Sequence, residues 1–580
     1  MTFLSNNFHL QNKQIAALFL GASATAGVIY FALFLAPFSG LDYQAVMELS
    51  TYTVLLGTFF GGLLLVNLGA LLFTILNLGY RQKVLQKNIA SFFARHSIAI
   101  VLALYAVLIL AGAFLLLVLP PIIRPLKFLE WYNVRLGDFL SWIFFADLLI
   151  IAMIRVITAE TWCNNSALAQ LDLILACAFL FLVTFVSYAH IAALIGWINK
   201  SNYSFWDLLS GQFLQGKLYL ENPPYTHDLT LYKGKWYVPM PPIPALLMVP
   251  IAYWIGAENI STSYLSMIFS AINGVLVYLI LKQLAQRKWI ELSKNGIFWL
   301  ILIFLFGTPH LWVGISGRGW FVSQILTVLF LALAIYASLR FWSSWIIATC
   351  LGLAIMTRPN SLMTWPLVFA ISMQIIKENQ GSIELKQVFQ WIIKTTFPIT
   401  LAVIGLLTYN YLRFENFLDF GYVNINGDPD IVTNVKTYGI FSPHFILPNL
   451  EVMFFKMPRI NWGAPWPVNL KGDLWPIDPR TTGMSMFITT PPLLYLFRRY
   501  QKKWWIIGAW LAILLNLVML SCYSNTGAAQ FGYRYILDFL VPLIMLLAVG
   551  VGKKNPWPFI ILALASIVIN IYGAYWFMNG

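Results

Sequence analysis

Residues 321–340 read FVSQILTVLFLALAIYASLR, and only the last of these residues is charged. A helical span of a lipid bilayer needs about 20 consecutive apolar residues, so this stretch is long enough to cross one. Within the hydrocarbon a chain must satisfy its backbone polar groups internally, and a helix does so. The stretch therefore predicts a transmembrane helix, and its recurrence along the chain decides the fold.

Similar apolar runs recur from one end of the 580 residues to the other. The chain is 60% hydrophobic and only 10% charged, whereas soluble domains carry about 25% charged residues. The alternation of apolar and polar residues that marks the strands of a membrane barrel is absent. The predicted fold class is therefore all-α, a polytopic membrane helical bundle of about 15 spans. We expect these spans near residues 14–36, 53–79, 98–119, 137–157, 170–197, 262–282, 296–313, 321–340, 342–356, 361–376, 391–411, 484–497, 504–522, 535–551 and 557–576.

The positive charge of the chain predicts its orientation in the membrane. The net charge is +14, but the cations lie in short connections between spans, which is typical of topology and not of nucleic-acid binding. We expect the basic connections to face the cytoplasm, and they are 80–97, 283–295, 498–503 and 552–554. The spans then alternate consistently if the short, proline-broken segment 241–255 does not cross. This topology places 198–261, 308–320 and 412–483 on the non-cytoplasmic side.

Two regions differ in character. Residues 1–165 contain four predicted spans with short connections and no polar cluster, and we interpret them as an N-terminal membrane extension of unknown role. Residues 166–580 carry the long outer loops 198–261 and 412–483 and form the second predicted domain. The four cysteines are scattered without metal-ligand spacing, so the sequence indicates no metal site and no cofactor.

The first long outer loop holds two candidate acids, Asp207 and Asp228. Asp207 lies in a stretch whose apolar residues fall on one helical face, which predicts an amphipathic helix at the membrane interface. Asp228 lies between prolines and aromatic residues that restrain the loop, so it could serve as a general base. The alternatives are a solvated helix residue for Asp207 and a turn-forming residue for Asp228.

Further candidates lie beside the predicted spans. His310 and Trp320 lie in the glycine-rich outer turn GTPHLWVGISGRGWF, where the alternative is a histidine without a role and a membrane-belt tryptophan. Arg358 lies between two apolar runs, where a cation is costly unless it faces a polar cavity or an anion. Arg534 precedes Asp538 by four residues, a spacing that would place both on one helix face as a local ion pair.

Six stretches, in this order along the chain, are similar to the GT-C superfamily of integral-membrane glycosyltransferases, and especially to relatives of the dolichyl-phosphate-mannose–protein mannosyltransferases. The resemblance covers about residues 170–551 and leaves 1–165 outside. The stretches are FWDLLSGQFLQGKLYLENPP, HDLTLYKGKWYVPMPPIPALLMVP, GTPHLWVGISGRGWF, GLAIMTRPNSLMTWP, YNYLRFENFLDFGY and QFGYRYILDFLVPLIMLL.

The resemblance implies a helical bundle with interface-lying helices in its first outer loop. It also implies a polyprenyl-phosphate sugar as donor, and a glycan, lipid or protein hydroxyl as acceptor on the non-cytoplasmic face. The reaction is expected to proceed with inversion, and no cofactor is implied. The expected location is the cell (inner) membrane, or the endoplasmic reticulum membrane in a eukaryote.

The resemblance also assigns roles to residues. An acid of the first outer loop is the base, and the frame around Asp228 matches best, with Asp207 second; the adjacent acidic pair usual in the family is missing. Cations stabilise the departing phosphate, and the side chains assigned to this role are Arg358, Arg534, Lys233 and Lys235. Residues expected to line the substrate site are His227, Trp236, Tyr237, His310 and Trp320.

Two other classes of function compete with this interpretation. A transporter or flippase of lipid-linked sugars would also place cations and aromatic residues beside the bilayer, but such proteins often contain paired repeats, and none is visible here. A non-catalytic membrane scaffold would account most easily for residues 1–165. The long outer loops favour an enzyme.

Overall fold

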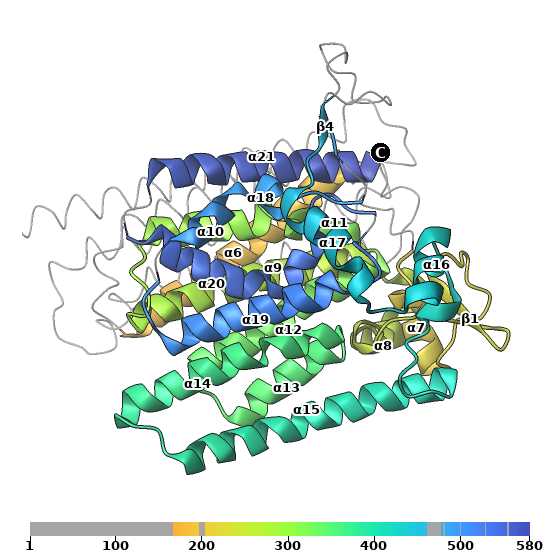
Figure 1. The fold of residues 1–580 in the computed structure, drawn as a ribbon, viewed down its shortest axis with the longest axis horizontal. Coiled ribbons are helices and arrows are strands. Elements are labelled where there is room, and N and C mark those ends of the chain that lie inside the picture. Colours follow the sequence, from red (N-terminus) through yellow and green to blue (C-terminus); the bar gives the residue numbers. More distant parts are fainter. Residues whose placement is uncertain are drawn as a thin grey trace, which may run out of the picture. The chain divides into compact units, whose positions relative to one another are not determined.

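The computed structural model describes residues 166–195, 203–460, 477–479, 482–498, 500–527, 529–553 and 556–579. The chain divides into two compact units, Met1–Val183 and Thr184–Gly580. Most described residues belong to the second unit, a bundle of helices (Figure 1). The four spans predicted before residue 166, and the N-terminal extension they form, lie outside the described residues.

Seven helical segments of the described part are long and apolar enough to cross a membrane, and an eighth candidate is a pair of helices bent by 49°. The chain is thus a multi-pass helical membrane protein, as its sequence predicts. The seven segments lie in α6 (Ser166–Leu194), α9 (Thr262–Gln286), α12 (Gly319–Leu339), α15 (Leu385–Phe414), α19 (Trp504–Ser521), η9 (Arg534–Phe539) with α20 (Leu540–Val551), and α21 (Trp557–Asn579). The bent pair is α10 (Lys294–Phe306) and α11 (His310–Ser316).

The structure corrects three predicted spans. The first two correspond to α13 (Ser344–Ile355) and α14 (Trp365–Gln380), joined by the 3₁₀ segment η4 (Pro359–Thr364). At 1.5 Å per residue, the 12 residues of α13 extend about 18 Å, short of the roughly 30 Å hydrocarbon core. The third, at 484–497, is replaced by the short helix α18 (Met486–Thr489) and the 3₁₀ segment η8 (Pro491–Phe497). Prolines at the starts of η4 and η8 prevent a continuous helix.

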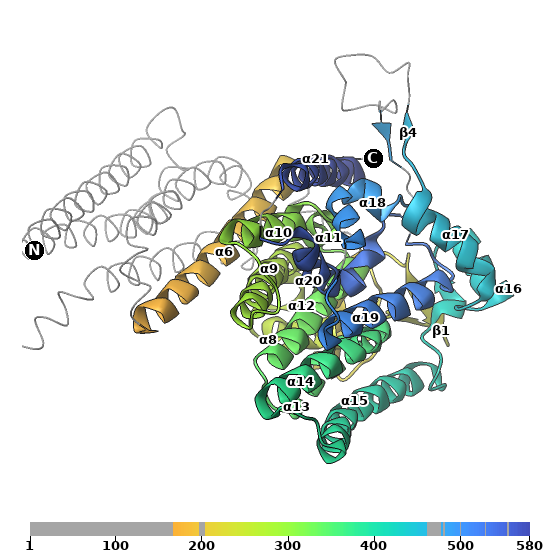
Figure 2. The ribbon, with the colours of Figure 1, turned by 60° about the vertical axis from the view of Figure 1, so that its left-hand side comes forward.

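The core of the second unit forms around α12 and the η9–α20 segment. In these two spans 89% and 94% of the residues are buried, compared with 28% for α15 and 39% for α21. Figures 1 and 2 agree with these values, because α15 and α21 lie at opposite edges of the bundle with α12 and α20 between them. Many large apolar side chains of α15, such as Phe389, Ile393 and Phe397, are exposed, as expected of a helix with one face toward lipid.

The first outer loop forms short helices beside the bundle. Asp207 lies in α7 (Trp206–Leu214), a helix of nine residues at the position where the sequence predicts an amphipathic one. The proline-rich segment 241–255 forms α8 (Ile243–Ile255). With 13 residues it extends about 20 Å, which is too short for a full span.

A small sheet in the outer loops corrects the all-α prediction. β1 (Leu229–Tyr232) and β2 (Lys235–Tyr237) form a hairpin, and β3 (Ile425–Asn426) of the second long loop pairs antiparallel with β1. Lys233 and Gly234 at the hairpin turn both have positive φ values, of 48° and 74°. A two-residue type I′ turn requires this conformation, and a glycine at its second position favours it. The sheet therefore fastens the two outer loops to each other.

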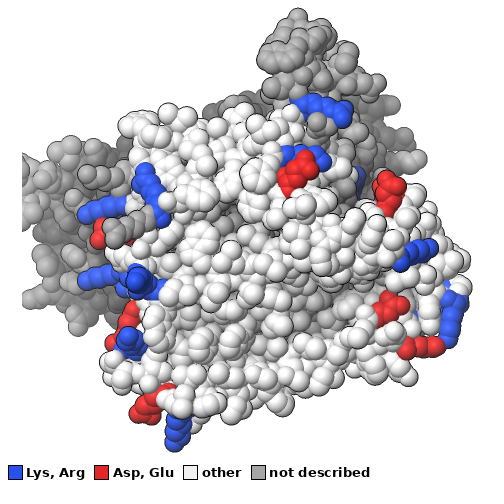
Figure 3. Space-filling model, viewed as in Figure 1, with Lys and Arg blue, Asp and Glu red and all other residues white. Residues whose placement is uncertain are grey.

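Shorter elements complete the described part of the second unit. They are η3 (Ala257–Asn259), η5 (Tyr422–Asn424), α16 (Pro429–Tyr438), η6 (Pro443–Phe445), α17 (Ile446–Leu450), η7 (Glu451–Phe455), β4 (Arg459–Ile460) and β5 (Ile477–Asp478). Figure 3 shows that charged side chains gather at the two ends of the visible helices and leave an uncharged zone between them. Such a zone fits a surface that contacts the hydrocarbon of a bilayer.

Gly421 lies at a close approach between the two outer loops. Its φ is 88°, and a Cβ atom there would lie 2.7 Å from Cζ of Phe414 and 3.0 Å from Oγ1 of Thr230. The Thr230 hydroxyl donates a hydrogen bond to the Gly421 carbonyl oxygen at 2.8 Å. The absence of a side chain at this position thus allows the loop to lie against β1.

We expect Gly421→Ala to destabilise the protein by about 1–3 kcal/mol, because alanine would adopt a strained φ and meet Phe414. The measurement is the apparent unfolding temperature of the purified protein in detergent. Gly405→Ala in α15 is the matched control, because its Cβ would first meet Met356 at an ordinary 3.5 Å. Equal unfolding temperatures for the two variants would contradict the close packing at Gly421.

Candidate functional site

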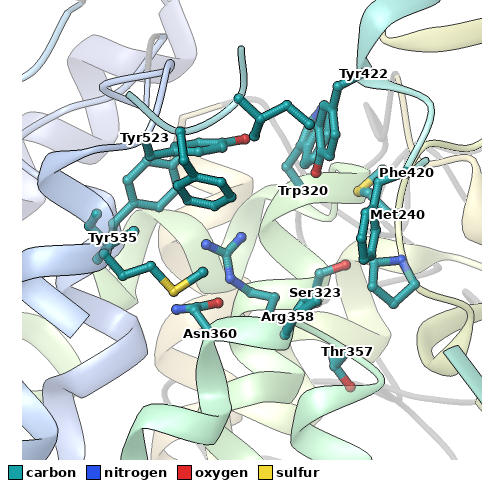
Figure 4. A pocket seen from close by; sticks show the side chains of 16 residues that line it. Met240, Trp320, Ser323, Thr357, Arg358, Asn360, Phe420, Tyr422, Tyr523 and Tyr535 are labelled. Atoms are coloured by element: carbon teal, nitrogen blue, oxygen red, sulfur yellow. The ribbon is translucent and has the colours of Figure 1, made fainter. Parts of the chain in front are cut away.

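A cavity of about 150 Å³ lies where several helices of the bundle end (Figure 4). Its walls come from the start of α12, the break between α13 and α14, the end of α19, the start of η9 and both outer loops. The residues that line it are Met240, Pro241, Trp320, Ser323, Thr357, Arg358, Pro359, Asn360, Phe420, Tyr422, Ile440, Phe441, Met519, Leu520, Tyr523 and Tyr535. Most are aromatic or aliphatic, and Arg358 is their single charged member.

Arg358 reaches this cavity because the helix α13 ends just before it in the chain. α13 ends at Ile355, and Arg358 itself has extended backbone, with φ −148° and ψ 114°. The next residue is Pro359, which disfavours helical conformation in the residue before it. The side chain therefore leaves the helix axis and extends into the cavity, as Figure 4 shows.

Arg358 forms an ion pair with Asp538 of η9. Its Nη2 donates to Oδ2 of Asp538 at 2.9 Å. The Asp538 side chain is completely buried, whereas 16% of the Arg358 side chain stays exposed. An anion entering from the cavity would therefore meet the arginine and not the aspartate.

This pairing excludes the alternative interpretation of Arg534 and Asp538 as a local ion pair on one helix face. The two residues lie in η9, which is a 3₁₀ helix with three residues per turn. Residues four apart are then separated by about 120° around the axis and do not share a face. Arg534 instead donates from Nε to the Gly527 carbonyl at 2.9 Å and from Nη1 to Gln324 at 3.1 Å. It holds the 527–534 loop against α12 and does not line the cavity.

Tyrosine rings surround the Arg358 guanidinium group. The Tyr535 ring centroid lies 5.2 Å from it, and the hydroxyl groups of Tyr422 and Tyr523 are joined by a hydrogen bond. Burial raises the pKa of Tyr422 to about 12, so this phenol keeps its proton. Burial alone would lower the pKa of Arg358, but Asp538 and Tyr535 hold it above its ordinary value. The cavity thus presents a permanent cation among neutral hydroxyl groups.

Asp228 is connected to the cavity through Trp320. The indole Nε1 of Trp320 donates to Oδ2 of Asp228 at 3.1 Å, and the indole ring stacks on Tyr422 at 6.2 Å. Asp228 has a positive φ of 65°, and its N–H donates to the Asn426 carbonyl at 2.7 Å. The carboxylate itself does not line the cavity, because the tryptophan lies between them.

Two neighbours complete the surroundings of Asp228. The Nε2 atom of His227 lies 3.8 Å from Oδ1 of Asp228, and the histidine side chain is 57% exposed. Arg318 lies close enough to interact electrostatically with Asp228, and burial lowers the pKa of this arginine. Asp228 therefore lies among one aromatic N–H donor and two basic side chains.

The other predicted acid and the two lysines lie outside the cavity. Asp207 accepts a hydrogen bond from the Ser204 hydroxyl at 2.5 Å in the first turn of α7. Lys233, in the hairpin turn, pairs with Glu415, and the hydrogen bond with Glu415 raises the pKa of Lys233. Lys235 lies over the ring of Tyr219 at 4.3 Å.

The remaining predicted lining residues have packing contacts of their own. His310 is completely buried, with Nδ1 2.8 Å from the Tyr188 hydroxyl and Nε2 3.3 Å from Nδ2 of Asn273. Trp236 pairs with Leu231 in the hairpin. Tyr237 packs edge-on against Phe414 at 5.3 Å. Of the eleven predicted site residues, only Arg358 and Trp320 line the cavity.

Sequence reasoning missed several residues of the cavity wall. Tyr422 and Tyr535 occur inside stretches that carry the family resemblance, but no spacing indicated that they would meet. Asn360, two residues after Arg358, donates to Asn516 at 3.2 Å and thereby joins the break between α13 and α14 to the helix α19. The Arg-Pro-Asn sequence between two apolar runs is the pattern that could have indicated Asn360 as a residue of the site.

Neither metal ligands among the described residues nor a match to a known protein indicates the function of this chain. Within the described ranges no group of three or more His, Cys, Asp or Glu side chains could hold a metal ion. Comparison with protein-family models, curated proteins and solved structures found no match to this chain.

We expect Arg358→Met to destabilise the protein by about 3 kcal/mol, because it leaves the Asp538 charge buried without a partner. Adding Asp538→Asn to this variant should recover most of the loss. Unfolding temperatures in detergent measure both effects. Lys233→Met is the control, because it breaks a solvent-exposed pair that contributes little to stability. If Arg358→Met matched that control, the buried ion pair would not contribute to stability.

Proposed function

We propose that the protein is a membrane glycosyltransferase that moves a sugar from a polyprenyl-phosphate donor to an acceptor hydroxyl on the non-cytoplasmic face. The observation that carries the proposal is the cavity that joins a fixed cation to a carboxylate through one tryptophan. Arg358 lies in the cavity wall, and Trp320 of the same wall binds Asp228. Inverting sugar transfer requires a phosphate-binding cation and a general base.

The position of the cavity along the helices supports this assignment. α19 begins directly after Lys502 and Lys503 and ends two residues before Tyr523, which lines the cavity. Its 18 residues extend about 27 Å, so the basic connection and the cavity lie at opposite ends of the helix. Because basic connections face the cytoplasm, the cavity opens at the other face.

The cavity walls suit a lipid phosphate. A guanidinium group is a good ligand for phosphate oxygens because it offers several N–H donors in one plane. The Tyr422 and Tyr523 hydroxyls supply neutral donors, while methionine, leucine and phenylalanine side chains supply apolar contacts. Arg358 stabilises the departing phosphate in this mechanism. Lys233, Lys235 and Arg534 lie outside the cavity and are not needed for this step.

The chemistry then follows from the two charged groups. The acceptor hydroxyl attacks the anomeric carbon as the bond from that carbon to the phosphate oxygen breaks. Asp228 takes the proton of the hydroxyl, and the phosphate leaves with the bonding electron pair. A single in-line displacement inverts the anomeric configuration. Polyprenyl phosphate is already a good leaving group, so no general acid is required.

We expect Asp228→Asn to lower sugar transfer by about 100-fold or more, which is the usual contribution of a general base. The assay follows release of polyprenyl phosphate from a panel of radiolabelled polyprenyl-phosphate monosaccharides in liposomes. Asp428→Asn, an exposed helix cap in the second outer loop, is the matched control and should keep near wild-type transfer. Loss with Asp207→Asn but not with Asp228→Asn would move the base to Asp207. If wild type consumed no donor, the glycosyltransferase proposal would fail.

Trp320→Phe tests the connection between the cavity and Asp228. Phenylalanine keeps an aromatic ring against Tyr422 but removes the N–H that holds the carboxylate. We expect kcat to fall about tenfold, as for loss of one hydrogen bond to a charged group, with KM little changed. Near wild-type transfer in Trp320→Phe, with loss only in Trp320→Ala, would instead indicate that stacking on Tyr422 is the important contact.

A further inference from the structure

Arg358 has unused hydrogen-bonding capacity at the cavity. Its Nη2 binds Asp538, but its Nε has no hydrogen-bond partner among the described residues. A guanidinium group in a water-poor site normally satisfies its donors. The guanidinium group therefore has donor capacity that Asp538 does not use, and the exposed 16% of the side chain lines the cavity, where an anion could meet it.

Asp538 is partly unsatisfied as well. It is completely buried, its Oδ2 accepts from Arg358, and its Oδ1 has no partner among the described residues. The nearby charged and titratable groups are Arg358 on η4, Tyr533 and Tyr535 on its own segment, and Arg534, which is turned to Gly527 and Gln324. Arg358 is the cation that balances Asp538.

We infer that Asp538 is a resident counter-ion that competes with the phosphate of the ligand for Arg358 and thereby sets the affinity of the cavity for anions. This inference rests on the proposed function for the source of the phosphate. The ligand approaches from the exposed side of the guanidinium group and Asp538 from the buried side. With both anions present the site carries at least one excess negative charge in a low-dielectric surrounding, which weakens ligand binding and favours release of the product phosphate.

The inference gives Asp538 a role that differs from a purely structural one. A purely structural carboxylate would position Arg358 for the ligand, and removing its charge would weaken phosphate binding. A competing counter-ion has the opposite effect, since its removal leaves the guanidinium group to the ligand alone. The sign of the change in affinity therefore separates the two roles.

The experiment compares wild type with Asp538→Asn, which keeps the size of the side chain and an acceptor oxygen. The probes are geranylgeranyl monophosphate, geranylgeraniol and inorganic phosphate, added to purified protein in detergent. We expect Asp538→Asn to bind the prenyl phosphate about tenfold more tightly than wild type, with little change for the alcohol. Glu378→Gln is the matched control, because it removes a carboxylate that binds Trp289 and Gln374 and not the cavity.

A second measurement covers the case in which Asp538→Asn is unstable. Prenyl phosphate should then raise its unfolding temperature more than that of wild type, because the phosphate replaces the missing carboxylate. The effect should disappear when Arg358→Met is added. An equal gain with inorganic phosphate would support the competition and identify the anion alone as the recognised group, without a prenyl chain.

Other outcomes would overturn the inference. If wild type preferred the phosphate to the alcohol but Asp538→Asn bound it no more tightly, competition would be excluded while the phosphate site and the proposed function stood. If neither protein distinguished phosphate from alcohol, the inference would fail together with the assigned role of Arg358. A gain in affinity without any sugar transfer by wild type would support the counter-ion and contradict the glycosyltransferase.

Discussion

The ion pair between Arg358 and Asp538 connects the two irregular segments on which the cavity depends. Arg358 lies in the break between α13 and α14, and Asp538 lies in the 3₁₀ turn that begins the α20 span. Non-helical backbone inside a membrane protein is tolerated only where it is buried in protein or lines a polar cavity. Here the two breaks face each other, and one buried charge pair holds them together. Removing one member of the pair would leave an unpaired charge on one break and an unfilled space beside the other.

The outer loops depend on the same end of the bundle. β1 and β3 bring the first and second long loops together, and Thr230 binds the carbonyl of Gly421. The residue on each side of Gly421, Phe420 and Tyr422, lines the cavity. Asp228 begins this connection by binding Asn426 through its N–H and Trp320 through its carboxylate. The helices thus place the cation of the site, and the loop sheet places the acid.

The sequence predicts the membrane helices well because length and apolar composition are local properties. It also places Arg358, since a cation between apolar runs requires a partner. It fails where the decisive contact is distant in the chain. The local alternative for Asp538 was an ion pair with Arg534, four residues away, but Asp538 pairs with Arg358 across 180 positions. The Lys233–Gly234 pair is a local signal for the turn of the hairpin. The third strand of the sheet, β3, lies nearly two hundred residues further along the chain. The tyrosines around Arg358 are also distant in the chain, because Tyr422, Tyr523 and Tyr535 follow it by 64, 165 and 177 positions.

The asymmetry of the buried pair links stability to binding. A pair that is equally buried on both sides would be closed to a ligand, and a fully exposed pair would contribute little to the fold. Arg358 is reached from the cavity and Asp538 is not, so the same guanidinium group can hold the breaks together and bind an anion. The aromatic wall strengthens both interactions because it keeps water away from them. When no ligand is bound, Asp538 balances the charge of Arg358. The site can therefore bind an anion without holding an unpaired buried cation in its empty state, and this is the physical reason for a carboxylate behind the arginine.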